Sequence, residues 1–241
     1  MKSLKICPQM MWERIYEMNV KVKEIFSSIQ GEGPVVGYKQ LFIRFCNCNL
    51  KCNYCDTEFD KTNSEEFSPQ ELYKKITSEY NLKTFHSISL TGGEPLLSAE
   101  FLKEFLPLIK RQTKVYLETN ATLSNNLEKI KNLIDIISAD IKLETSTGLN
   151  TFDKHREFFT HCNGIETFAK IVFDKNITEE EIKTCAEIGN EFNIELVLQP
   201  KMIEDKMSVN SDFCNELLEK FTALHHNTRL IPQVHKFLDV R

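Results

Sequence analysis

The sequence lacks the features that mark membrane proteins, secreted proteins and general nucleic-acid binders. No apolar run approaches the roughly 18 consecutive residues that a membrane-spanning helix requires, and the N-terminal segment has no continuous hydrophobic stretch of the signal-peptide kind. Long runs of lysine or arginine are absent and the formal net charge is -5, which disfavours a nucleic-acid surface. We therefore expect a cytoplasmic protein that binds a small molecule and has neither a membrane nor a nucleic-acid partner.

Glycine and proline are also sparse. The chain has only eight Gly and seven Pro among 241 residues, with 41% hydrophobic and 27% charged residues, which is a globular rather than a disordered composition. This length supports one substantial core, so we expect a single domain over residues 1–241. Residues 1–19 carry no clear periodicity before the first strand-like run, VKVKEIF (20–26), and are predicted to be an N-terminal extension of unknown role.

Short β-rich runs then alternate with longer helical stretches, which is the pattern of repeated βα units. Barrel strands are predicted at 41–45, 87–91, 115–119, 136–141, 168–173 and 194–200, with a further β-like run at 229–234. Helices are predicted to begin after the capping-box residues Ser68 and Thr178, and a last helix is predicted at about 212–225. Right-handed crossovers between parallel strands predict an α/β fold that curls into a partial (β/α)6 barrel, with ligands at the carboxyl ends of its strands.

Cysteine, in contrast, is plentiful and locally clustered. In a reducing compartment, the eight cysteines point to metal or redox chemistry rather than to disulfides. Cys48, Cys52 and Cys55 form a C-x3-C-x2-C loop directly after the first barrel strand. Three thiolates can bind three corners of an iron–sulfur cube, whereas a closed site normally needs a fourth. The open iron can chelate the methionine end of S-adenosylmethionine (SAM), and an electron delivered through the cluster can break its carbon–sulfur bond.

The alternative interpretation of this loop is a structural zinc site with Cys46 as the fourth ligand. Cys46 lies only two residues before Cys48, and no second C-x2-C pair follows, so we interpret Cys46 as a buried thiol at the end of the strand. The remaining cysteines are scattered and are predicted to be buried or incidental: Cys7, Cys162, Cys185 and Cys214.

The run from Arg44 to Thr57, RFCNCNLKCNYCDT, resembles the 7-carboxy-7-deazaguanine synthases of the radical SAM superfamily, and the resemblance extends from about Val20 to Arg241. It implies a partial barrel of the radical SAM type and a lyase that converts 6-carboxy-5,6,7,8-tetrahydropterin to 7-carboxy-7-deazaguanine with loss of ammonia, on the pathway to queuosine-type tRNA bases. A [4Fe–4S] cluster, SAM and Mg²⁺ are the implied cofactors. The implied partners are an electron donor such as flavodoxin or ferredoxin and a second copy of the chain in a homodimer.

Several motifs agree with a substrate pocket. The glycines of the segment SIQGEGP (28–34) permit close backbone approach to a ligand. Arg44 is a charged residue in the apolar strand LFIRF; it could form an ion pair on a strand face, or its planar guanidinium could clamp a carboxylate. The resemblance implies that the substrate contacts Ile29, Gln30, Gly31, Arg44, Thr91, His235 and Arg241.

Polar residues after later strands could bind SAM or could be ordinary turns and strand caps. The Gly-Gly of TGGEP (91–95) lets the backbone approach a ligand, and Glu94 could accept from an ammonium group. The resemblance assigns Mg²⁺ to Thr57 and implies these SAM contacts: Tyr54, Cys55, Asp56, Gly93, Glu94, Ser138, Ala139, Asp140, Gln199, Pro200, Lys201 and Met202.

Two other functions fit the cysteine loop. A glycyl-radical-enzyme activating protein would expose a docking surface and would cleave SAM only together with its partner protein. A structural zinc module would contain one zinc and no iron, whereas the radical SAM interpretation requires about four irons and four sulfides per chain.

Overall fold

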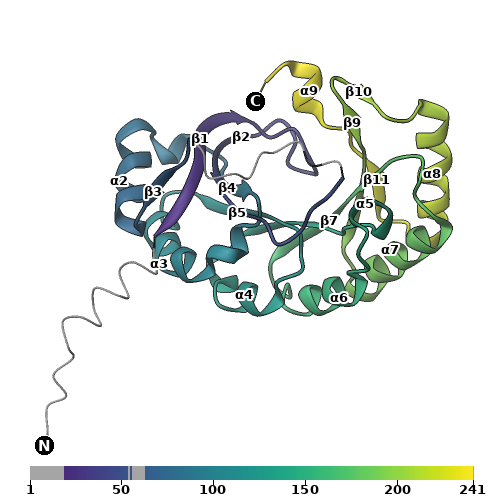
Figure 1. The fold of residues 1–241 in the computed structure, drawn as a ribbon, viewed down its shortest axis with the longest axis horizontal. Helices are drawn as coiled ribbons and strands as arrows, with labels where there is room; N and C mark the ends of the chain where they lie inside the picture. The colour runs from purple at the N-terminus through teal and green to yellow at the C-terminus, as the bar shows by residue number, and fades with distance from the viewer. Residues whose placement is uncertain (1–18, 54, 56–62, 241) are drawn as a thin grey trace, which may run out of the picture.

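The computed structural model describes residues 19–53, 55 and 63–240 and contains a nine-stranded sheet surrounded by helices (Figure 1). The strand order is β11-β8-β7-β6-β5-β4-β2-β1-β3. The predicted barrel strands are all present and parallel: β2 (Lys39–Phe45), β4 (Ser87–Gly92), β5 (Lys114–Thr119), β6 (Ile136–Asp140), β7 (Glu166–Phe173) and β8 (Glu195–Pro200). The last β-like run contributes β11 (Thr228–Leu230), a further parallel strand beside β8. Since β11 and β3 remain as free edges, the predicted α/β partial barrel is confirmed.

Antiparallel strands extend the sheet beyond β2. The run predicted at 20–26 belongs to β1 (Val20–Ile29), which pairs with β2 on one side and with β3 (Glu65–Phe67) on the other. A separate hairpin is formed by β9 (Met202–Ile203) and β10 (Lys206–Met207). These short strands have no periodic pattern of their own, so β3, β9 and β10 were not predicted from the sequence.

The longer helices lie on the outer side of the curved sheet (Figure 1). Both predicted capping boxes are present, with Ser68 before α2 and Thr178 before α7, and each cap accepts a backbone N–H while a glutamate three residues on bonds back. The helices are α2 (Pro69–Glu79), α3 (Ala99–Ile109), α4 (Ser124–Glu128), α5 (Glu144–Thr147), α6 (Phe152–Thr160), α7 (Glu179–Phe192), α8 (Ser211–Leu224) and α9 (Val234–Leu238). Among the described residues, no helix is long and apolar enough to cross a membrane.

Side chains of the barrel strands alternate between two environments, as the pleat requires. The outer set packs beneath the helices in the main core; on β5, for example, Val115 and Leu117 belong to it and are fully buried. The intervening residues Tyr116 and Glu118 face the inside of the barrel. A small apolar cluster fills part of this interior: Val35, Tyr116, Ile136, Phe168 and Val197. The inner positions nearer the carboxyl ends are largely polar, which is why the interior can accept a polar ligand.

Candidate active site

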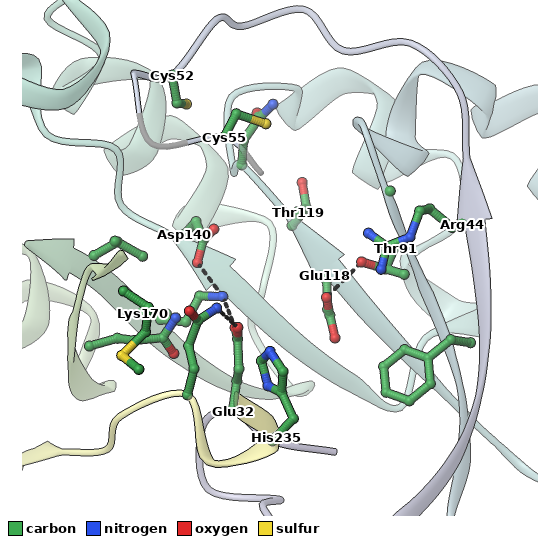
Figure 2. A pocket seen from close by; sticks show the side chains of 18 of the residues that line it. Glu32, Arg44, Cys52, Cys55, Thr91, Glu118, Thr119, Asp140, Lys170 and His235 are labelled. Carbon is green, nitrogen blue, oxygen red and sulfur yellow. Dashed lines mark hydrogen bonds and ion pairs between the residues drawn. The ribbon is translucent and has the colours of Figure 1, made fainter. Parts of the chain in front are cut away.

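A cavity of about 320 Å³ opens at the carboxyl ends of the parallel strands. Its walls come from the cysteine loop, the ends of the parallel strands, the turn after β1 and the C-terminal segment before and within α9. Figure 2 shows Cys52 and Cys55 at one end of the view and Glu32 and His235 at the other, with Arg44 and Asp140 on opposite sides. The predicted location of the ligand site is therefore the location of this cavity.

The cysteine loop places all three predicted ligands on the cavity wall: Cys48, Cys52 and Cys55. Burial raises the pKa of Cys48, and burial together with the neighbouring Cys48 and Cys55 raises the pKa of Cys52. In the part of the chain that is described, no three His, Cys, Asp or Glu side chains already converge on one point as a metal site. The loop therefore directs three thiols into one cavity.

Cys46 does not join the three loop cysteines on the cavity wall. Its side chain is only 4% exposed, and it is not among the residues that line the cavity. The next residue, Asn47, has a left-handed φ of 67°, which turns the chain out of β2. Gly93 packs against this turn so closely that a Cβ would lie 1.7 Å from the Asn47 carbonyl oxygen. The location of Cys46 agrees with the predicted buried thiol at the end of the strand.

Predicted substrate residues from opposite ends of the sequence meet in space. Gly31 and His235 are in contact, since a Cβ on Gly31 would lie 2.3 Å from Nδ1 of His235, and the Val234 amide donates to the Gly31 carbonyl at 2.8 Å. Ile29, Gln30, Gly31 and His235 all line the cavity. The C-terminal segment thus covers one side of the site. Its position in the sequence alone does not predict this placement.

Glu118, one of the polar residues at the end of β5, is the centre of a polar cluster and was not among the predicted site residues. Its Oε2 accepts from the Thr91 hydroxyl at 2.7 Å, and its Oε1 accepts from Nε2 of Gln30 at 3.0 Å and from Ser89 at 3.1 Å. Glu118 and Thr91 both line the cavity, and Figure 2 shows their side chains bonded to each other. A glutamate on the inward phase of an apolar strand, two residues after Tyr116, is the signal that could have identified it.

Arg44 lines the cavity as predicted and also forms an ion pair. Its Nε lies 2.6 Å from Oε1 of Glu24 on the adjacent β1, and its guanidinium lies over the Phe26 ring, 5.8 Å from the centroid. The side chain is 25% exposed. Arg44 is therefore an ion-paired strand residue that lines the cavity, and its binding of a carboxylate remains a prediction.

A second charged cluster crosses the opposite wall; Asp140 was predicted as a site residue, but Glu32, Lys142 and Lys170 were not. Lys170 on β7 pairs with Glu32, and its Nζ lies 3.3 Å from Oδ1 of Asp140, while Nζ of Lys142 lies 2.6 Å from Oδ2 of Asp140. Nε2 of Gln233 donates to Oε1 of Glu32 at 2.6 Å, which connects this cluster to the C-terminal segment. Lysine within the apolar strand FAKIVF was the available signal for Lys170.

This cluster keeps its charges in spite of burial. Burial alone would raise the pKa of Glu32, but the Lys170 ammonium and the hydrogen bond from Gln233 lower it to about 2. Burial alone would lower the pKa of Lys170, but Asp140 and Glu32 raise it well above its usual range. At neutral pH both groups are ionised, so the wall presents fixed charges to a ligand.

The predicted SAM residues divide into two groups. Gly93, Asp140, Gln199, Lys201 and Met202 line the cavity together with Cys55, whereas Ser138, Ala139 and Pro200 do not. The side chain of Ala139 packs in the main core, because its position on β6 faces the helices. Ser138 is only 3% exposed. Contacts between SAM and these three residues remain predictions.

Glu94 also differs from the expected exposed acceptor. It is fully buried, does not line the cavity, and accepts from the Asn120 amide at 2.7 Å, the Thr119 hydroxyl at 2.8 Å and the Leu96 amide at 3.0 Å. Burial raises its pKa to about 7. In this structure it connects the ends of β4 and β5, and its contact with SAM remains a prediction.

Four predicted site residues lie outside the described residues: Tyr54, Asp56, Thr57 and Arg241.

The described residues fit the iron–sulfur cluster and the SAM that the sequence implies as cofactors. Oε1 of Gln199 is buried on the cavity wall with no hydrogen-bond partner among the described residues, so it can accept a hydrogen bond from a ligand N–H. The three loop cysteines face the same space, and thiolates are the usual ligands of iron–sulfur clusters. A cavity of about 320 Å³ has the size of a small-molecule site.

Comparison with known proteins agrees with these features. The radical SAM superfamily model matches residues 42–188. The 7-carboxy-7-deazaguanine synthase of Geobacter sulfurreducens is 34% identical, covering 90% of this chain and 96% of the relative. The enzyme of the same name from Archaeoglobus fulgidus is 34% identical over 93% of this chain and 100% of the relative, and that of Rickettsia prowazekii is 33% identical over 92% and 88%.

Solved structures share the fold. QueE from Escherichia coli superposes with a TM-score of 0.64 at 20% identity, covering 93% of this chain and 98% of that protein. A radical SAM methyltransferase from Sphaerobacter thermophilus gives a TM-score of 0.60 at 10% identity over 81% and 66%. The cysteine loop, the open barrel and the full-length relatives agree: this chain belongs to the radical SAM superfamily and, within it, to the 7-carboxy-7-deazaguanine synthase family.

Proposed function

We propose that this chain converts 6-carboxy-5,6,7,8-tetrahydropterin to 7-carboxy-7-deazaguanine and ammonia. One observation carries the proposal: a single cavity is lined both by the three loop cysteines and by a hydrogen-bonding cluster around Glu118. Such a cavity can hold a redox cofactor and a small polar heterocycle in contact with each other. The full-length similarity to synthases of this name supports the same substrate.

Membership in the radical SAM superfamily brings a [4Fe–4S] cluster and SAM as cofactors. Cys48, Cys52 and Cys55 would hold the cluster, and Gln199 would accept a hydrogen bond from the SAM adenine. When bound, the cluster and SAM would supply the radical that abstracts hydrogen from the substrate. The protein side chains would bind and orient these groups. Thr57 is proposed as the protein ligand of Mg²⁺, which completes its octahedron with water and substrate oxygens.

The substrate is proposed to bind through groups whose charge and donor pattern match it. The carboxylate of Glu118 is held by Thr91 and Gln30, and it would accept from the N–H groups of the aminopyrimidine ring. Arg44 would bind the substrate carboxylate, because Glu24 holds its Nε and fixes the guanidinium plane at the cavity wall. The Glu118 carboxylate on one side and the Arg44 guanidinium on another would together fix the orientation of the bound heterocycle.

The C-terminal segment is proposed to exclude water from the bound substrate. His235 packs on Gly31, and Gln233 donates to the buried Glu32, so the segment is attached to the barrel at two points. Ile29, Gln30 and Gly31 would contact the substrate on this side, together with Arg241. Closure of this kind protects a radical reaction from solvent.

The assembly is proposed to be a homodimer of single-domain chains, with residues 1–19 as an N-terminal extension, and to receive electrons from a flavodoxin or ferredoxin. Light scattering of the purified holoenzyme would test the dimer. Reduction of the cluster by each donor in turn, followed by EPR spectroscopy, would test the electron source.

The test of function is an anaerobic assay with reconstituted chain, dithionite, Mg²⁺, the carboxy-pterin and SAM in amounts far below the pterin. The family reaction regenerates SAM, so we expect deazapurine product to exceed the SAM supplied. A variant with alanine at all three loop cysteines should make none. A fully loaded wild-type cluster that yields no deazapurine would refute the proposal, and one SAM consumed per product would refute the catalytic use of SAM.

A further inference from the structure

Three side chains next to the cysteine loop form a closed ring of hydrogen bonds. Nδ2 of Asn49 donates to the Thr122 hydroxyl at 2.9 Å, this hydroxyl donates to Oδ1 of Asn120 at 2.6 Å, and Nδ2 of Asn120 donates to Oδ1 of Asn49 at 2.8 Å. Each member donates once and accepts once, so the ring runs in one direction. It joins the cysteine loop to the segment that follows β5.

The direction of the ring fixes the orientation of the Asn120 amide. The Thr122 hydroxyl already accepts from Asn49, so its single proton must go to an acceptor, and Oδ1 of Asn120 is that acceptor. Flipping the Asn120 amide alone would place an N–H against the hydroxyl proton and an oxygen against Oδ1 of Asn49. In this arrangement the amide nitrogen of Asn120 faces the cysteine loop.

One N–H of this amide remains after the ring is closed, and its neighbour is a sulfur. Nδ2 of Asn120 lies 3.8 Å from Sγ of Cys48, within hydrogen-bond range for sulfur, and the Leu50 amide lies 3.5 Å from the same atom. Asn120 is only 6% exposed, and its backbone amide donates to Glu94 at 2.7 Å. The donor is therefore fixed at both its backbone and its side chain.

We propose that Asn120 is a positioning residue that raises the reduction potential of the [4Fe–4S] cluster by donating a hydrogen bond to the Cys48 sulfur. The inference rests on the proposed function, because it requires Cys48 to be a cluster ligand. Dithionite or a protein donor reduces the cluster by one electron, and no proton is transferred in this step. Reduction increases the negative charge on the ligand sulfurs, so an N–H donor stabilises the reduced form more than the oxidised form.

The experiment compares anaerobically reconstituted holoenzymes by EPR-monitored redox titration. At the potential where half of the wild-type cluster is reduced, Asn120→Ala should lower the ratio of reduced to oxidised cluster about tenfold, which is a shift of about 59 mV for one electron. Thr122→Val should lower the ratio less, because the amide remains but can rotate. Thr122→Ser keeps the hydroxyl and should restore the wild-type potential.

Two further measurements separate tuning of the cluster from a general loss of structure. Pulsed EPR of the reduced enzyme in D₂O should show an exchangeable deuteron coupled to the cluster that is lost in Asn120→Ala. Asn126→Ala is the matched control, since Nδ2 of Asn126 bonds a backbone carbonyl, Leu96, at 2.9 Å, and no cysteine. This control should leave the potential unchanged.

A ratio within twofold of wild type in both Asn120→Ala and Thr122→Val, at equal iron and sulfide content, would overturn the inference. If Asn120→Ala fails to fold or to load the cluster, the two Thr122 variants decide. A lowered potential in Thr122→Val with the wild-type potential in Thr122→Ser supports the proposed role of Asn120. An unchanged potential in Thr122→Val overturns it. A wild-type chain that binds no iron would instead refute the proposed function, and a wild-type chain with a titratable cluster but no product would leave the Asn120 result valid.

Discussion

The ion pair between Lys170 and Glu32 allows a stability prediction to be worked through in full. Their side chains are 9% and 17% exposed, and the pKa of Glu32 is about 2 instead of 4.5. At about 1.36 kcal/mol per pH unit, this difference corresponds to ~3 kcal/mol of folding free energy at neutral pH. Glu32→Gln should lose a large part of this free energy, because Lys170 keeps Asp140 as its only carboxylate within ion-pair distance among the described residues.

A double-mutant cycle of Glu32→Gln, Lys170→Met and the double variant measures the coupling directly. Urea unfolding of the cluster-free chain, followed by far-UV circular dichroism, gives the free energies without a contribution from metal release. The exposed pair of Lys220 and Glu179, with Nζ and Oε1 2.7 Å apart and side chains 40% and 76% exposed, is the control and should show little coupling.

The pH dependence of the coupling has a definite sign. The folded pKa of Glu32 is below its unfolded value, so the stabilisation is fully present above pH 4.5 and is lost as the pH falls toward about 2. A coupling no larger than that of the exposed pair at neutral pH, or one that grows as the pH falls, would refute the reasoning.

Three further predictions concern the cysteine loop, the turn that packs against it and the buried His155. Alanine at any one of the three loop cysteines should reduce iron and sulfide content to near background, whereas Cys46→Ala should keep the wild-type content; equal loss in Cys46→Ala would make it a ligand. Gly93→Ala should displace the cysteine loop, since its Cβ would lie 1.7 Å from the Asn47 oxygen, and cluster loading should fall with it; normal loading would show that the turn can move. The pKa of His155 is lowered by burial from 6.5 to about 4, so wild-type stability relative to His155→Gln should decrease by up to ~3 kcal/mol as the pH falls from 6.5 to 4, and a pH-independent difference in urea titrations would contradict this.

The barrel could be predicted because its strands are short β-rich runs separated by helical stretches, two of which begin at capping boxes. β4, for example, is the run SISLT extended by Gly92, and α7 begins where the Thr178 capping box predicts. In contrast, β3 contains Glu65 and Glu66, both exposed, and is a strand only because its backbone pairs with β1. Local sequence carries no information about such pairing.

The cysteine loop and the strand ends could be located from the sequence, but the pairing of residues within the charged clusters could not. The three loop cysteines are close in sequence, so their spacing already defines a ligand set. Glu32 and Lys170 are 138 residues apart, and only the curvature of the sheet brings them together. Glu94 was expected to accept from a ligand ammonium group; in the structure it accepts from backbone and side-chain donors within the protein, and its contact with SAM stays a prediction.

A sheet that stays open must also protect its two edges. An exposed edge strand can pair with the edge of another molecule and begin an aggregate. Here both edge strands are only three residues long: β3 exposes Glu65 and Glu66, and β11 exposes Arg229, which pairs with Glu195 on β8. Short, charged edges give an incoming strand little to bind, so the barrel can leave its interior accessible without inviting growth of the sheet from one molecule to the next.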